Sequence, residues 1–372
     1  MVHSSHQSLE DACAGIAYVV HSLNDPKTNI TTPAPHANPA IDTCWSYLGT
    51  QPGILAAIAA GTNMIWAITP LLADHPLITT SLPSCIKLIA NPPKVVDIVD
   101  DKAFTNKLLQ HHGFLTPKSW LLEGDPKRAI ERLGQLVYDL PCPVILKPVR
   151  GSGSEGVQLV NGFVSMLDAL ANLLNIDSVI LVEELLEAEE GTVTLVPDGQ
   201  GNFMALTIVL PFGHVSGVMP WSGHIPVAKN SRVLSAREED SWRRAAKIEC
   251  PKAAGLLKLT SATRIDICRK DENGGKFFLF DINSKPNLTG AGRPGRENQD
   301  SLCPLAAKEF GWEYPTFVRK FIETTRHLQE ARAIESPGAV VGSFDNFTIW
   351  ETWSGKGKDG VAGNSDVQEK SS

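Results

Sequence analysis

Residues 261–283 read SATRIDICRKDENGGKFFLFDIN, and this stretch decides the fold. The runs 261–270 and 276–283 are rich in β-branched and aromatic residues and alternate polar with apolar side chains. Such runs around a short polar segment are typical of two antiparallel strands. The segment contains Asn273–Gly274, the dipeptide that most strongly favours a tight hairpin turn. The stretch therefore predicts a β-hairpin.

With the turn centred on that dipeptide, Asp266 faces Asp281 and Arg264 faces Asn283. Side chains alternate between the two faces of a strand, so these four polar groups share one face. Two directly opposed carboxylates repel each other, and a divalent cation bound through oxygen atoms removes that repulsion. The alternative is a solvated polar face with Arg264 as the counter-ion. The predicted apolar face carries Ile265, Ile267, Phe280 and Ile282.

A glycine-rich loop, GSGSEG at 151–156, matches the pattern GxGxxG. A dinucleotide-binding loop opens a helix, whereas here strand-like runs, 144–149 and 157–160, lie on both sides of the loop. Lys147 precedes the loop, so backbone N–H groups and one lysine point to a phosphate site. The alternative is a flexible surface hairpin with an ordinary lysine.

The composition indicates a globular protein and argues against a nucleic-acid binder. The 372 residues carry a formal net charge of -7, with 42% hydrophobic and 20% charged residues, and no basic patch stands out. The seven cysteines form no CxxC pair, which fits free thiols in a reducing compartment. We therefore expect a cytoplasmic protein.

The stretch 43–73 has no charged residue, and its part from 53 to 73 is long enough to cross a bilayer. It contains proline, asparagine and threonine, and much of its apolar content is alanine. We therefore predict a buried helix at 54–60 and a buried strand at 64–68, with no membrane span.

The order of the remaining elements predicts a mixed α/β fold with several domains. We expect an apolar strand at 14–20 and a small parallel sheet in an N-terminal domain. The predicted helices are 94–112 (in more than one piece), 126–140, 164–174, one beginning at 238, and a closing helix at 314–332. The expected divisions are 1–95, a small subdomain with the glycine loop at 96–180, a larger subdomain with the metal site at 181–335, and a largely disordered tail at 336–372.

Five segments occur in an order that is more specific than any one of them. They are Asp101–Lys102, PVILKP (143–148) with its loop, VILVEELLEAEEGTV (179–193), TRIDIC (263–268), and FLFDIN (278–283) with Pro286. Together they resemble the ATP-grasp superfamily, and most closely its D-alanine–D-alanine ligase-like branch, over roughly Asp101 to Phe321. The resemblance implies an ATP-grasp fold preceded by a small N-terminal α/β domain.

The resemblance also implies how a nucleotide is held. Glu183 and the backbone of Leu185 and Leu186 would meet the adenine, and Glu190 would accept hydrogen bonds from the ribose hydroxyls. The loop around Ser154 would cover the phosphates. The implied nucleotide-binding residues are Lys102, Lys147, Gly153, Ser154, Gly156, Glu183, Leu185, Leu186, Glu190 and Lys229.

By the same resemblance, Asp266, Asp281 and Asn283 would bind Mg²⁺ (or Mn²⁺). The implied reaction joins a carboxylate to an amine through an acyl phosphate at the expense of ATP. Arg264 and Lys147 would stabilise the negative charge that develops on oxygen. Arg293, Arg296 and Ser301 would bind the acid substrate. The shorter Asp281 stands where the family more often has glutamate, and 290–300 is an enlarged loop, which leaves the substrates open between D-alanine-like amino acids and the acids and amines of secondary metabolism.

Two other functions remain open at this stage. The chain would be an ATP-binding regulatory or scaffolding protein if it had lost catalysis, since Gly153 replaces a loop serine of the D-alanine enzymes. It would be an NAD(P) oxidoreductase if GxGxxG were a dinucleotide loop. The expected partners are a small carboxylate and an amine, with no nucleic acid and no membrane, and a homodimer is possible.

Overall fold

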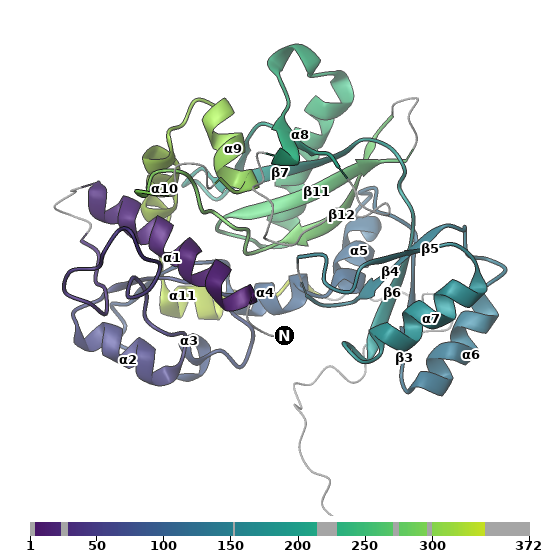
Figure 1. The fold of residues 1–372 in the computed structure, drawn as a ribbon, viewed down its shortest axis with the longest axis horizontal. Helices are drawn as coiled ribbons and strands as arrows, with labels where there is room; N and C mark the ends of the chain where they lie inside the picture. Colours follow the sequence, from purple (N-terminus) through teal and green to yellow (C-terminus); the bar gives the residue numbers. More distant parts are fainter. Residues whose placement is uncertain are drawn as a thin grey trace, which may run out of the picture. The chain divides into compact units, whose positions relative to one another are not determined.

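A computed structural model describes residues 4–23, 29–151, 153–213, 229–270, 275–295 and 300–338, with side chains from Cys13 onward (Figure 1). Three sequence predictions lie outside the described residues. They are the Asn273–Gly274 turn, the substrate contact of Arg296, and the disordered tail beyond residue 338.

The largest sheet has six strands, in the order β10-β9-β7-β11-β12, with β8 attached to β7. Every pairing in it is antiparallel. Helices α8, α9 and α10 contact this sheet. The elements are β7 (Glu190–Pro197), β8 (Phe203–Ala205), β9 (Val209–Pro211), β10 (Ser231–Val233), β11 (Thr263–Arg269), β12 (Phe277–Asn283), η2 (Ala236–Glu238), α8 (Ser241–Leu256), α9 (Leu302–Glu309) and α10 (Tyr314–Glu323).

A second, four-stranded antiparallel sheet has the order β3-β6-β4-β5, and α6 and α7 pack on it (Figure 1). Its core is apolar: Leu122, Leu133, Leu146 and Leu170 are fully buried. The predicted helices at 126–140 and 164–174 and the predicted strands at 144–149 and 157–160 are confirmed. The elements are β3 (Ser119–Glu123), α6 (Pro126–Leu136), β4 (Val144–Pro148), β5 (Gln158–Val160), α7 (Phe163–Leu173) and β6 (Val179–Glu184).

The predicted N-terminal parallel pair exists, but its sheet has a third strand from the other end of the chain. β1 runs parallel to β2, and β13 pairs antiparallel with β2. The predicted single closing helix is therefore wrong: α10 ends at Glu323, and β13 separates it from α11. The elements are α2 (Gln51–Ala59), β1 (Met64–Trp66), α3 (Pro76–Thr79), β2 (Lys87–Ile89), α4 (Pro93–Val99), α5 (Lys102–His111), β13 (Arg326–His327) and α11 (Leu328–Ala333).

The predicted strand at 14–20 is wrong, because this run lies inside helix α1 (Ser4–Ser22). Ile16, Val19 and Val20 are buried in one cluster with Phe317 and Phe321 of α10. Residues three and four apart lie on the same face of a helix, so the run forms one apolar stripe. A short apolar run is compatible with both structures, and packing against α10 decides between them.

The uncharged stretch 43–73 contains a helix and a strand at the predicted places, α2 and β1. They are less buried than predicted, because only Ile54 and Ala57 of α2 are buried and β1 is half-buried. Within the described ranges, no helix is both long and apolar enough to cross a membrane. None of the seven cysteines, all of which lie in the described residues, forms a disulfide bond.

Candidate active site

β11 and β12 form the predicted antiparallel hairpin, and at its open end the predicted register is confirmed. Arg264 is opposite Asn283, and Asp266 is opposite Asp281. β11 also pairs with β7 along its other edge. Backbone hydrogen bonds on both sides therefore hold the strand that carries Arg264 and Asp266.

Nearer the turn the register shifts by one residue. Ile267 is opposite Leu279, and the shift falls between Asp266 and Ile267, so β12 carries a β-bulge. Leu279 is buried opposite Ile267, while Phe280 is only half-buried. Placing Phe280 on the apolar face was wrong, because strict alternation ends where one strand carries an extra residue.

Arg264 and Asp266 form a bidentate ion pair. The Nε–Oδ1 and Nη2–Oδ2 distances are both 3.0 Å, and the side chains are only 11% and 15% exposed. Burial lowers the pKa of Arg264, but the charge of Asp266, its hydrogen bonds and the charge of Asp281 outweigh burial and raise that pKa overall. Arg264 is therefore a permanent cation, and it is the counter-charge of Asp266 in this structure.

The oxygen donors of Asp266, Asp281 and Asn283 suit a hard cation such as Mg²⁺. The amide oxygen of Asn283 also accepts a hydrogen bond from the backbone N–H of Lys285 (3.1 Å), which fixes its direction. No group of three or more His, Cys, Asp or Glu side chains forms a metal site in the described part of the chain. The predicted set has two carboxylates and one amide, so water and phosphate oxygens would have to complete the coordination.

Two predicted nucleotide contacts, Lys147 of β4 and Glu183 of β6, lie against each other. Lys147 Nζ is 2.6 Å from Glu183 Oε2, and the side chains are 6% and 5% exposed. The other carboxylate oxygen of Glu183 accepts a hydrogen bond from Asn106 Nδ2 (2.8 Å). The pair is possible because Ile145, two residues before Lys147, is the strand partner of Glu183. Both charges are thus compensated, as burial requires.

The glycine-rich loop joins two antiparallel strands, because β4 pairs antiparallel with β5. Gly153, Ser154 and Gly156 all have positive φ angles, of 73°, 56° and 73°. A Cβ at Gly156 would lie 3.0 Å from Leu173 and Pro148, so glycine is required there by space as well as by conformation. Lys102 Nζ donates to the carbonyl of Gly151 (2.5 Å), so it lies at the base of this loop.

The segment between β6 and β7 contains the residues predicted to meet adenine and ribose. Leu185 and Leu186 are half-buried and follow directly on β6, and Glu190 begins β7. Cys268 of β11 is the strand partner of Glu190, and its thiol lies 3.6 Å from the Leu186 carbonyl oxygen. The end of β11 therefore supports this segment from one side.

Two of the predicted substrate residues, Ser301 and Arg293, have protein partners in this structure. Ser301 is buried, and its hydroxyl donates to the Asn287 carbonyl (2.7 Å). Arg293 is 2% exposed, forms an ion pair with Asp42, and donates to the Ile41 carbonyl (3.1 Å). Arg293 thus links the enlarged loop to the N-terminal part of the chain.

Lys229, a predicted nucleotide contact, is exposed and lies two residues before β10.

Three polar residues around the site were not predicted from the sequence. Asn106 binds Glu183 (2.8 Å), and Glu184 forms an ion pair with Lys270 (2.8 Å). Asn91 is 2% exposed and donates to the Ser284 carbonyl (2.6 Å), next to Asn283. Asn91 precedes two prolines and so has the local signature of a turn residue, and nothing local in the sequence identifies its partners.

A cavity of about 310 Å³ lies away from these residues. Its lining includes Pro197, Thr260, Glu323, Arg326 and Glu330. None of the predicted site residues contributes to it, so it is not the predicted nucleotide site.

Known proteins resemble this chain in sequence and in fold. The family model described as "D-ala D-ala ligase C-terminus" matches residues 109–323, more than half of the chain. A D-alanine--D-alanine ligase of Chromohalobacter salexigens is 28% identical over 227 residues, which cover 60% of this chain and 65% of that relative. The ligase of the same name from Pelotomaculum thermopropionicum is 26% identical over 229 residues, 60% of this chain and 67% of the relative. The chain thus matches about two thirds of these relatives' length.

Solved structures show the same fold. The VanG D-Ala:D-Ser ligase of Enterococcus faecalis superposes with a TM-score of 0.52 at 18% identity, over 64% of each chain. The D-alanine-D-alanine ligase of Coxiella burnetii gives 0.52 at 15% identity, over 66% of this chain and 62% of that one. The mixed α/β fold is therefore that of the ATP-grasp ligases, and the chain belongs to the D-ala D-ala ligase C-terminus family.

Proposed function

We propose that the chain is an ATP-dependent carboxylate–amine ligase that forms an amide bond through an acyl phosphate. The observation that carries this proposal is the register of β11 and β12, which sets Arg264 opposite Asn283 and Asp266 opposite Asp281. Two acids, an amide and a permanent cation on adjoining strand positions can bind a metal and stabilise an anion at the same place.

In this proposal the nucleotide lies between the site residues of the two antiparallel sheets. Lys147 and Lys102 bind phosphate oxygens, and the N–H groups around Gly153, Ser154 and Gly156 cover them. Glu183, Leu185 and Leu186 meet the adenine, Glu190 binds the ribose, and Lys229 adds a further positive charge for the phosphates. The buried Lys147–Glu183 pair supports the proposal, because it holds a phosphate-binding cation beside an adenine contact.

Asp266, Asp281 and Asn283 would hold Mg²⁺ or Mn²⁺. When bound, the ion would neutralise charge on the phosphate oxygens of ATP. Asp266 would then share its carboxylate between the ion and Arg264, whose two hydrogen bonds already orient it.

The chain's own residues would act in both steps of the reaction. The substrate carboxylate attacks the γ-phosphate to give an acyl phosphate and ADP, and the amine then displaces phosphate from the acyl carbon. Negative charge develops on oxygen in each step, and Arg264 and Lys147 stabilise it as fixed cations. The glycine-rich loop covers the acyl phosphate and excludes water.

We propose amino-acid-like substrates, since two relatives are named D-alanine--D-alanine ligase. Ser301, Arg293 and Arg296 would bind the acid. For Arg293 this requires that a substrate carboxylate compete with Asp42, its partner in the structure. The enlarged loop that carries Arg293 distinguishes this chain's acid site from a simple D-alanine site.

The oxidoreductase alternative fails on topology. A dinucleotide-binding loop leads from a strand into a helix, whereas this loop leads from β4 into the antiparallel strand β5. A regulatory protein without catalysis is not favoured, because Arg264 and all three oxygen ligands are present on the hairpin.

We further propose the functional division into 1–95, 96–180 and 181–335, with β13 and α11 joined to the first part through β2. The partners would be a small carboxylate and an amine. We propose a reducing, cytoplasmic setting, which seven cysteines without a disulfide bond support, and a homodimer as the assembly to test.

The test is ADP release by the full chain over a panel of D- and L-amino acids and other acids and amines, with Mg²⁺-ATP. We expect at least one acid–amine pair to stimulate ADP release. Asp281→Ala should lose this activity, and Glu249→Gln, which alters an exposed ion pair on α8, should keep it. A folded chain that no pair stimulates would overturn the proposal.

A further inference from the structure

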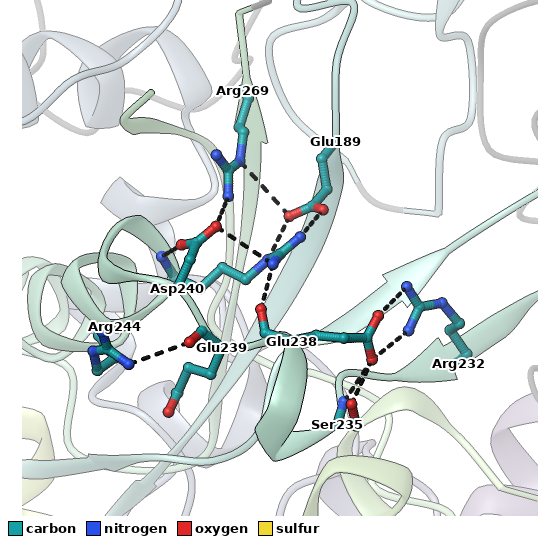
Figure 2. Close-up of polar contacts among 9 residues, drawn as sticks. Glu189, Arg232, Ser235, Glu238, Glu239, Asp240, Arg244 and Arg269 are labelled. Carbon is teal, nitrogen blue, oxygen red and sulfur yellow. Dashed lines mark hydrogen bonds and ion pairs between the residues drawn. The ribbon is translucent and has the colours of Figure 1, made fainter. Parts of the chain in front are cut away.

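Four charged side chains at the junction of β7, β11 and α8 form a closed cluster, which we call the Glu189 cluster: Glu189, Asp240, Arg243 and Arg269. Arg243 Nε donates to Glu189 Oε1 (2.9 Å), and a second Arg243 nitrogen binds Glu189 Oε2. Arg269 Nη2 donates to Asp240 Oδ2 (2.8 Å), and Arg269 Nε lies 3.7 Å from Glu189 Oε1. Figure 2 shows Glu189 and Asp240 on either side of Arg269.

The Glu189 cluster is electrically balanced and partly buried. Its two acids and two arginines cancel, and the side chains of Arg269, Arg243 and Glu189 are 8%, 16% and 27% exposed. Asp240 also accepts from the backbone N–H of Arg243 (2.8 Å) as the N-cap of α8. Each carboxylate therefore forms ion pairs with arginine side chains of the protein. The contact between Arg243 and Glu189 is bidentate, and bidentate contacts fix geometry more firmly than single ones. Because its charges compensate one another, the cluster stabilises the local geometry and does not require a bound ion.

The position that the cluster holds is the start of β7. The backbone N–H of Arg269 donates to the Glu189 carbonyl (3.0 Å), and Ala188 N–H donates to the Arg269 carbonyl (3.3 Å). The backbone of Glu189 is thus hydrogen-bonded to Arg269 of β11, and its side chain is bonded to Arg243 of α8. Successive side chains of an extended chain point to opposite sides, so fixing Glu189 directs Glu190 the other way.

We propose that Glu189 and Arg243 are positioning residues that hold Glu190 in reach of the ribose hydroxyls, and so make the site selective for ribonucleoside triphosphates. This inference rests on the proposed function, from which the contact between Glu190 and ribose is taken. Glu189 and Arg243 act only through Glu190 and touch no substrate.

The expected effect follows from the strength of a hydrogen bond to a charged group. Loss of one such bond costs roughly 10-fold or more in affinity. If the cluster orients Glu190 towards the ribose, its disruption raises the KM for ATP by about 10-fold. The KM for 2′,3′-dideoxy-ATP stays unchanged, because this nucleotide lacks both ribose hydroxyls. If the cluster had only a structural role, its disruption would raise the KM for both nucleotides equally or lower kcat with both.

The experiment compares ATP with 2′,3′-dideoxy-ATP in the full chain, by ADP-forming turnover and by calorimetric titration in the presence of Mg²⁺. The variants are Glu189→Gln, Arg243→Lys and the reference variant Glu190→Gln. Arg243→Lys keeps the positive charge and carries the test if Glu189→Gln does not fold. The control is Arg232→Gln, which breaks the neighbouring Arg232–Glu238 pair (2.8 Å; Figure 2) without touching Glu189.

We expect the wild type and Arg232→Gln to prefer ATP. Glu189→Gln and Arg243→Lys should lose most of that preference while kcat changes less than about 3-fold, and Glu190→Gln should lose the preference as well. If Glu190→Gln loses the preference and the two cluster variants keep it, the positioning inference is wrong and the nucleotide site stands. If Glu190→Gln keeps the preference, or the wild type has none, the ribose contact itself is wrong. A chain that binds neither nucleotide would overturn the proposed function.

Discussion

Asn91 Nδ2 lies 2.6 Å from the carbonyl oxygen of Ser284, the residue that follows Asn283. The same amide group donates to the Ala262 carbonyl (3.1 Å), and Asn91 Oδ1 accepts from the N–H groups of Thr260 (2.7 Å) and Ser261 (2.8 Å). One buried side chain thus joins the segment that enters β11 to the segment that leaves β12. These are the two ends that carry Arg264 and Asn283.

Asn91→Ala should lower the free energy of unfolding by about 2–4 kcal/mol, because two backbone N–H groups and two carbonyl groups lose their partner in a buried place. Urea denaturation measures the loss. Asn175→Ala removes one exposed hydrogen bond at the end of α7 and should change stability by less than about 0.5 kcal/mol. Equal effects of the two substitutions would contradict the role of Asn91.

Asp281→Ala should reduce kcat for ADP release by about 100-fold or more, since a metal ligand that stabilises phosphate charge is lost. Asp281→Glu keeps a carboxylate ligand and should retain measurable turnover with a changed dependence on Mg²⁺ concentration. Both variants should melt close to the wild type in circular dichroism, because Asp281 is only half-buried. Normal turnover by Asp281→Ala would show that the metal lies elsewhere.

Lys147→Met should destabilise the chain by about 3–5 kcal/mol, because it leaves the buried Glu183 charge without its cation. The double variant Lys147→Met/Glu183→Gln should recover much of this loss, since neither charge remains and the amide oxygen introduced at position 183 would still accept from Asn106. Chemical denaturation of the two single variants and the double variant gives the coupling energy. If the double variant lost as much unfolding free energy as the two single variants together, the pairing would be contradicted.

Mg²⁺-ATP binding should be weak in every variant that lacks Lys147.

Stability should fall in alkaline solution, in part because of Cys303. Burial raises the pKa of this thiol to about 11 in the folded chain, although the Arg264 charge opposes the rise, and the ordinary value is 9.0. Below pH 9 both states keep the proton and the contribution is complete. As the pH rises from 9 towards 11, the unfolded chain loses the proton first, and the free energy of unfolding decreases.

Cys303→Ala should therefore make the fall in unfolding free energy between about pH 8 and 10.5 less steep than in the wild type. Cys85 is exposed, so Cys85→Ala is the matched control and should leave the slope unchanged. Urea midpoints at a series of pH values measure both slopes. Parallel curves for Cys303→Ala and the wild type would show that Cys303 ionises as easily in the folded chain as in the unfolded one.

Short-range sequence patterns predicted those parts of the site that depend on strand periodicity. Asp266 and Asp281 are opposite each other because both belong to one hairpin with few residues between its strands. Strand-like runs on both sides of the glycine loop argued against a dinucleotide loop, and the antiparallel pairing of β4 with β5 bears this out. The β-bulge at Phe280 was not predictable from alternation, because packing of Leu279 against the core selects it.

Partners distant in the sequence were decided only by the tertiary structure. The apolar run at 14–20 suits a strand or a helix, and the cluster with Phe317 and Phe321 makes it a helix. Asn91 and Ser284 are 193 positions apart, and Arg293 and Asp42 are 251 apart, so no local pattern relates them. The sequence by itself determined the hairpin, the loop and the chemical types of the site residues, because backbone periodicity and turn preferences act over a few residues. The tertiary structure decided which buried polar groups compensate one another, because every buried charge and amide must find its partner wherever the packed chain brings one close.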